Sequence, residues 1–118
     1  MRILIADDNQ RVRDGVRAML LSQPNYEVCG EAADGEEALR LARELRPDLI
    51  LLDVSMPRQS GLETARLIRR ELSETKIVIM SQNDAEQLLP VAIQAGAQAC
   101  VDKSRLGLDL LASIASLA

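Results

Sequence analysis

Short apolar runs recur along the chain and predict the strands of a β-sheet. Three of the runs are continuous and rich in branched side chains, and they occupy residues 3–6, 49–52 and 77–80. Continuous runs of this kind are typical of parallel strands that are covered on both faces. They therefore indicate the central strands of a sheet with helices on either side.

Two further stretches have the pattern of strands at the margins of this sheet. Residues 26–32 alternate between two faces, which is expected of a strand at a sheet edge. One of these faces carries Tyr26, Val28, Gly30 and Ala32. A fifth, shorter strand is expected at residues 99–102.

Apolar residues recur at helical spacing between the strands. The five predicted helices run from Val12 to before Pro24, from after Asp34 to before Pro47, from after Ser60 to Leu72, from Ala85 to Ala95 and from Leu106 to Leu117. Asp34 with Glu37, and Ser60 with Glu63, have the spacing of capping boxes. These pairs predict the start of the second and third helices.

The fourth helix contains a proline at position 90 and is followed by Gly96. A proline inside a helix removes one backbone hydrogen bond and costs about 3 kcal/mol unless the helix kinks or begins later. We therefore expect a weak or irregular start to this helix. Gly96 is suited to the left-handed position that follows a helix end.

Five strands that alternate with five helices over residues 1–118 predict one α/β domain. Short connections and the absence of repeats or linkers favour a doubly wound parallel sheet with right-handed crossovers. In such a sheet, ligands bind beyond the carboxyl ends of the strands.

Polar side chains follow four of the five predicted strands. They are Asp7, Asp8, Asp53, Ser81 and Lys103. Crowded carboxylates repel each other, and a hard divalent cation with oxygen ligands, such as Mg²⁺, relieves that repulsion. The alternative for each residue taken alone is a solvated acidic loop, a capping aspartate or a surface lysine. Their joint position at one rim favours a cation site in a small cleft.

Composition narrows the chemistry further. The 118 residues carry 14 Lys+Arg against 18 Asp+Glu, with no His, no Trp, no Phe and one Tyr. Without His there is no Ser-His-Asp triad and no His-ligated zinc. An acidic balance with one aromatic residue disfavours direct nucleic-acid binding.

The chain has no long apolar run of the kind that indicates a signal peptide or a membrane span, so we expect a cytoplasmic protein. Cys29 and Cys100 are interpreted as buried small hydrophobes rather than a disulfide.

The ordered set of motifs resembles the receiver domain of response regulators over the whole chain. The matching residues are Ile5 to Asn9, Asp48 to Pro57, Gly61, Ser81, Ala95 to Ala97 and Lys103. Within that family the sequence is most similar to receivers that precede a helix-turn-helix DNA-binding domain, which leaves open whether such an output domain follows residue 118. The resemblance implies a flavodoxin-like fold with strand order 2-1-3-4-5.

The resemblance also implies roles for individual residues. Asp53 would accept the phosphoryl group, and Asp7, Asp8, Asp53 and the backbone carbonyl of Ser55 would bind Mg²⁺ or Mn²⁺. Ser81, Gln82, Lys103 and Cys100 occupy the phosphoryl-binding and switch positions. Such a domain is not an enzyme for other substrates, because it catalyses only its own phosphotransfer and dephosphorylation.

The expected partner is a histidine kinase or phosphotransfer protein acting in trans, because the chain contains no His. The resemblance further implies a changed surface over the fourth helix, fifth strand and fifth helix, with a homodimer through that surface as one outcome. Two positions depart from the family. Cys100 replaces the usual Tyr or Phe, and Gln82 replaces a small side chain.

Two other functions remain open at this point. A phosphorylation-independent interaction module would keep the fold without the switch, and Cys100 and Gln82 favour it. A hydrolase with an aspartate nucleophile shares the chemistry. It normally needs a second acid two residues after the nucleophile, where this chain has Ser55, or an inserted cap domain.

Overall fold

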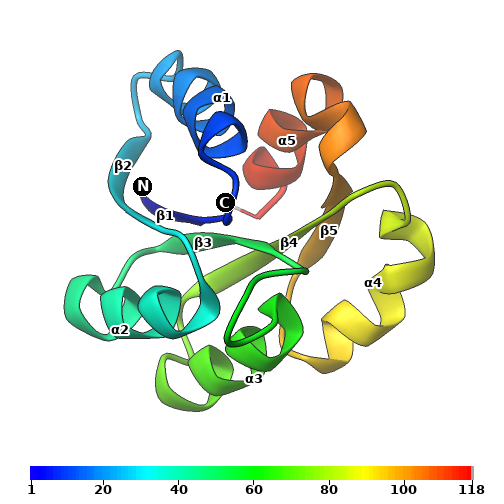
Figure 1. Cartoon of the computed structure of the whole chain (residues 1–118). Coiled ribbons are helices and arrows are strands. Elements are labelled where there is room, and N and C mark those ends of the chain that lie inside the picture. The colour runs from blue at the N-terminus through cyan, green and yellow to red at the C-terminus, as the bar shows by residue number, and fades with distance from the viewer. Residues whose placement is uncertain (118) are drawn as a thin grey trace.

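All five strands run parallel in one sheet, in the order β2-β1-β3-β4-β5. The computed structural model describes residues 1–117 (Figure 1). The strands are β1 (Arg2–Ala6), β2 (Glu27–Ala32), β3 (Leu49–Asp53), β4 (Lys76–Ser81) and β5 (Ala99–Asp102). The predicted α/β class, the five strands and the strand order are confirmed.

Helices cover both faces of the sheet. They are α1 (Gln10–Leu21), α2 (Gly35–Leu45), α3 (Gly61–Glu71), α4 (Ala85–Gln94) and α5 (Leu106–Ala115), with a short 3₁₀ turn at Lys103–Arg105. In Figure 1, α1 and α5 lie on one side of the sheet, and α2, α3 and α4 lie on the other. The five predicted helices are confirmed, although α5 ends at Ala115 rather than at Leu117.

The predicted caps form the starts of α2 and α3. The Asp34 carboxylate accepts a hydrogen bond from the Glu37 N–H at 2.8 Å, and the Glu37 carboxylate accepts one from the Ala33 N–H at 2.8 Å. The Ser60 hydroxyl accepts from the Glu63 N–H at 3.2 Å. These contacts satisfy backbone donors that the helix itself leaves free.

The strand β3 lies at the centre of the sheet, and every residue in it is buried. Its side chains alternate between the two apolar clusters, one under α1 and α5 and the other under α2, α3 and α4. This burial fixes the position of the last residue of the strand, Asp53, at the rim of the sheet.

The predicted alternation of residues 26–32 is wrong in its second half. Tyr26 and Val28 pack against the cluster beside α1 and α5, but Ala32 belongs to the cluster beside α2. The register with β1 shifts between Ile3 and Leu4, so that one extra residue is accommodated at Cys29. A bulge of this kind moves the following side chains to the other face.

Helix α4 continues through Pro90 without a break. The side chain of Asp84, at the N-cap position, makes no capping hydrogen bond, but the Leu88 N–H donates to the Asp84 carbonyl at 2.9 Å, so the first turn forms and a weak start stays a prediction. Gly96 has a φ of 103°, the left-handed conformation expected after a helix end.

The cysteines are free, and both are half-buried rather than fully buried as the sequence suggested. Cys29 lies in β2 and Cys100 in β5, which form opposite edges of the sheet. Among residues 1–117, the helices are too short or too polar to cross a lipid bilayer.

Candidate functional site

A cleft of about 600 Å³ lies at the carboxyl ends of the strands. It is lined by Asp8, Asn9, Val12, Asp53, Ser55, Gln82, Lys103 and Ser104. These residues come from the segments that follow β1, β3, β4 and β5, as expected for an open parallel sheet. Of the polar residues predicted to follow the strands, Asp8, Asp53 and Lys103 line this cleft.

The segment after β1 holds two acidic residues in different surroundings. Asp7 is fully buried, its Oδ1 accepts a hydrogen bond from the Asn9 N–H at 2.8 Å, and its own N–H donates to the Ala32 carbonyl at 3.0 Å. Asp8 is exposed and faces the cleft. Asn9 then caps α1 by accepting from the Arg11 N–H at 2.9 Å, which fixes the direction of the whole segment.

Asp53 ends β3 at the base of the cleft and is 3% exposed. Its Oδ1 accepts a hydrogen bond from the Ser55 N–H at 3.2 Å and lies 3.0 Å from Nζ of Lys103. Burial raises the pKa of the Asp53 carboxyl, and the neighbouring negative charge of Asp7 raises it further, although the hydrogen bond from Lys103 opposes both effects. The positive charge of Lys103 thus only partly offsets the cost of burying a charged Asp53 carboxylate beside Asp7.

Lys103 joins two of the three carboxylates. Its ammonium lies 2.7 Å from Oδ2 of Asp7 and 3.0 Å from Oδ1 of Asp53, and its side chain is 12% exposed. Burial alone would lower the pKa of Lys103, but the hydrogen bonds to Asp7 and Asp53 outweigh burial and raise it. Lys103 is therefore held as a fixed positive charge at the rim of the cleft.

The three carboxylates fit a hard divalent cation. One oxygen each from Asp7, Asp8 and Asp53 lies within 4.8 Å of the others, a separation suited to a shared ion. Oδ2 of Asp7 is buried and, apart from the Lys103 ammonium, has no hydrogen-bond partner among the described residues. The donor set is all oxygen and carries more negative charge than one ammonium balances, which favours Mg²⁺ or Mn²⁺ over softer metals.

The hydroxyl of Ser81 does not join this cluster, contrary to the expectation that it would converge on the cleft. Ser81 ends β4, is fully buried, and donates to Oδ1 of Asp102 at 3.2 Å. The physical reason is that Asp102 lies directly opposite Ser81 in the β4–β5 register and offers a charged acceptor. Asp102 is absent from the residues predicted for the site, although its place just before Lys103 at a strand end put it near the rim.

The two departures from the family pattern lie beside this segment. Gln82 is exposed and lines the cleft, so its side chain borders the space in front of Asp53. Cys100 is half-buried on the α4 side of β5. Burial raises the pKa of the Cys100 thiol, and the adjacent Ser81 hydroxyl partly opposes that effect.

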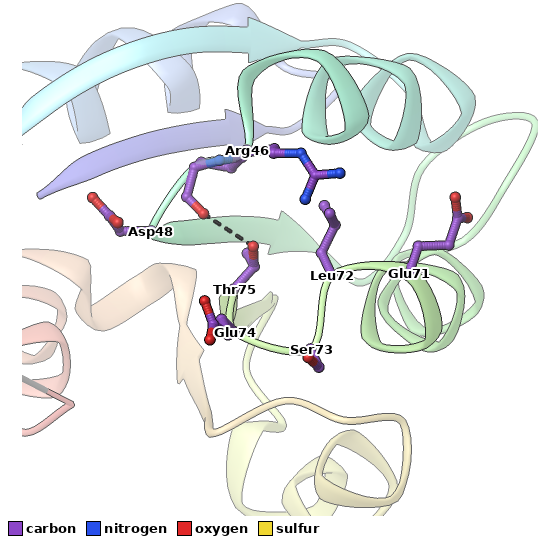
Figure 2. A pocket seen from close by; sticks show the side chains of 8 residues that line it. Arg46, Asp48, Glu71, Leu72, Ser73, Glu74 and Thr75 are labelled. Atoms are coloured by element: carbon purple, nitrogen blue, oxygen red, sulfur yellow. Dashed lines mark hydrogen bonds between the residues drawn. The ribbon is translucent and has the colours of Figure 1, made fainter.

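A second pocket, of about 310 Å³, lies at the opposite end of the strands (Figure 2). It is bounded by the segment from Arg46 to Asp48 and the segment from Glu71 to Thr75. The Thr75 hydroxyl donates to the Pro47 carbonyl at 3.0 Å and ties these two segments together. The cleft at the carboxyl ends, not this pocket, contains the carboxylate cluster.

Comparison with known proteins supports the observed fold. The family model of the response regulator receiver domain matches residues 3–115. The transcriptional regulatory protein YxjL of Bacillus subtilis, described as uncharacterized, is 41% identical over 118 residues, covering 100% of this chain and 54% of that protein. The transcriptional regulatory protein LiaR of the same organism is 47% identical over 98 residues, covering 82% of this chain and 46% of that protein. The chain thus spans about half the length of these curated relatives.

A solved structure agrees with the observed architecture. The crystal structure of a two-component response regulator of the LuxR family from Aurantimonas superposes with a TM-score of 0.92 at 35% identity, over 98% of this chain and 83% of that one. The family model, these relatives and the five-stranded sheet in the order 2-1-3-4-5 agree. The chain belongs to the response regulator receiver domain family.

Proposed function

We propose that this domain is a phosphoaspartate switch in which Asp53 accepts a phosphoryl group. The observation that carries the proposal is the arrangement of Asp7, Asp8, Asp53 and Lys103 around one cleft at the rim of the sheet. Of these three carboxylates, Asp53 is the one that ends the central strand and lines the cleft. It is therefore held rigidly at the base of the cleft through which a phosphoryl donor would reach it.

In the proposed transfer, a carboxylate oxygen of Asp53 attacks the phosphorus of a phosphohistidine on a partner protein. The phosphorus–nitrogen bond breaks, its electron pair stays on the imidazole, and that nitrogen takes up a proton. The product is an acyl phosphate on Asp53. Hydrolysis by water releases inorganic phosphate and restores the carboxylate, so the domain catalyses only its own phosphorylation and dephosphorylation.

The residues around Asp53 supply charge and position. Asp7, Asp8 and Asp53 would hold Mg²⁺, with the Ser55 backbone beside them. When bound, the ion supplies positive charge that offsets the phosphoryl oxygens during transfer. Lys103 is already placed 3.0 Å from Asp53, where its ammonium can pair with another phosphoryl oxygen.

The response to phosphorylation would begin at the segment after β4. A phosphoryl group adds roughly 1.5 to 2 negative charges and three strong acceptors. Ser81 can donate to one of these acceptors once its hydroxyl leaves Asp102. Gln82 borders the same space and would slow access by donor or water. The change would reach α4, β5 and α5, where Ile93 is 55% exposed and Leu108 is 73% exposed, a surface suited to a partner or a second copy of the chain.

A phosphohistidine donor would lie outside residues 1–118, because these residues contain no His. A histidine kinase or a phosphotransfer protein fits that requirement. The relatives named as transcriptional regulatory proteins are about twice as long as the matched region. We therefore place this domain in a longer regulator whose downstream part binds DNA, while the receiver itself does not.

Treatment with acetyl phosphate and Mg²⁺, followed by intact mass spectrometry, separates the candidate functions. A phosphoaspartate switch accumulates one phosphoryl group. A phosphorylation-independent interaction module, which the replacement of the usual ring by Cys100 favours, accumulates none. A hydrolase releases phosphate without accumulating a phosphoprotein. Either of the last two results would overturn the proposal.

A further inference from the structure

One carboxylate oxygen ties the end of β4 to the start of α4. Oδ1 of Asp102 accepts the Ser81 hydroxyl at 3.2 Å and the Ala85 N–H at 2.8 Å. Ala85 is the first residue of α4. The neighbouring Asp84 precedes the helix but makes no side-chain capping bond, so the N-cap contact comes from β5 instead.

We propose that Asp102 is the positioning residue of the switch, holding Ser81 away from the phosphoryl site and anchoring the first turn of α4. The inference rests on the function proposed above. Both donors meet the same oxygen, so the Ser81 hydroxyl can turn to a phosphoryl group only by giving up its bond to Asp102. Oδ1 of Asp102 would then accept only the Ala85 N–H. A phosphoryl group in the cleft would therefore change the hydrogen bonding at the start of α4.

The surroundings of Ser81 and Ala85 favour their hydrogen bonds to Asp102 over hydrogen bonds to water. Ser81 is fully buried and Ala85 is buried, so water does not readily replace either donor's partner. A charged acceptor holds a hydroxyl more strongly than a neutral one does. The second tie between the same segments, from the Ser104 hydroxyl to Oδ1 of Asn83 at 3.3 Å, is exposed and does not involve Ser81. Asp102 is half-buried, and it links the two segments through two donors that are themselves buried.

The first test compares beryllofluoride affinity, measured by titration calorimetry with Mg²⁺, in wild type and Asp102→Asn. An amide oxygen keeps the shape but weakens both hydrogen bonds, so Ser81 is released more easily. We expect binding to tighten about five-fold. The matched control is Asp84→Asn, which removes the same charge from the same region without breaking a capping hydrogen bond. An effect no larger than that of the control would overturn the inference.

The second test uses Ser81→Ala to separate positioning from general structure. Without the hydroxyl there is nothing for Asp102 to restrain, so Asp102→Asn should then change beryllofluoride affinity by less than about two-fold. A merely structural role for Asp102 would give the same change in both backgrounds and would overturn the inference.

The third measurement needs no ligand. In the unliganded protein, amide exchange at Ala85, followed by NMR, should be about ten-fold faster in Asp102→Ala than in wild type. An unchanged rate would show that Asp102 does not anchor α4.

If wild type does not bind beryllofluoride at all, the proposed function fails and the switch role fails with it. If wild type binds and Asp102→Asn binds equally well, only the role of Asp102 fails.

Discussion

Nζ of Lys103 lies 2.7 Å from Oδ2 of Asp7, a carboxylate with no solvent exposure. The two residues follow β1 and β5, and they meet beside Asp53 at the end of β3. The ion pair therefore connects the segment after the edge strand β5 to the segment after β1, across the end of the central strand β3. It also sets the charge that any phosphoryl group in the cleft would encounter.

Lys103→Met should destabilise the protein by about 3 to 5 kcal/mol in EDTA, because it leaves the buried Asp7 carboxylate without its partner. The double variant with Asp7→Asn should lose less than the sum of the two single losses, since the unpaired charge is gone. Urea unfolding measures these free energies. Additive losses in the double variant would contradict the coupling, and the exposed Arg105→Met serves as the control.

The pH dependence of stability should report the buried Asp53. Its pKa is raised above the ordinary value of 3.8 by burial and by Asp7, so the native state binds a proton more tightly than the unfolded state. The contribution of Asp53 to the free energy of unfolding therefore falls as pH rises from 3.8 through the raised pKa. Asn at position 53 does not titrate.

The stability of Asp53→Asn relative to wild type should consequently increase with pH across that window in EDTA. Urea unfolding at a series of pH values gives the difference. The exposed Asp14→Asn should show no such trend. A difference that shrinks as pH rises would mean that Asp53 is stabilised in its charged form.

Two glycines with different surroundings should respond oppositely to alanine. Gly15 lies within α1, and a Cβ added there would have open space around it, so Gly15→Ala should stabilise the protein by about 0.5 to 1 kcal/mol. At Gly61 the Cβ would lie 2.1 Å from the Asp53 carbonyl oxygen. Gly61→Ala should therefore cost about 3 kcal/mol. Thermal and urea unfolding measure both changes, and equal effects would refute this packing of the segment after β3.

Activation should change residues 82–90 more than β5. Cys100 supplies no ring that could move through the sheet edge, and Pro90 leaves α4 one backbone hydrogen bond short. Hydrogen exchange with and without beryllofluoride and Mg²⁺ measures the response. A change confined to residues 99–102 would contradict the prediction. Unchanged protection throughout would favour a phosphorylation-independent module.

Much of the fold follows from local pattern. The apolar runs predict β1, β3 and β4, and the side chains of Asp34 and Ser60 predict where α2 and α3 begin. The sequence also predicts which site residues meet, because parallel strands place their carboxyl ends at one rim. These residues are Asp7, Asp8, Asp53 and Lys103.

The features that sequence did not predict depend on contacts between distant segments. The register shift at Ile3 and Leu4 arises from pairing of β1 with β2 and redirects Ala32. The orientation of Ser81 depends on Asp102, which is 21 residues away in sequence. Hydrophobic periodicity describes which face a residue occupies, but it does not say which acceptor a buried hydroxyl selects.

The most direct test of the central claim is the intact mass of wild type and Asp53→Asn after acetyl phosphate treatment, with Mg²⁺ or with EDTA. We predict one added phosphoryl group on wild type in Mg²⁺, none on wild type in EDTA, and none on Asp53→Asn in either condition. Circular dichroism of both proteins excludes misfolding as the cause of a negative result. Phosphorylation of Asp53→Asn at the wild-type rate, or phosphorylation of wild type undiminished by EDTA, would contradict the assignment of Asp53 as the metal-dependent phosphoacceptor.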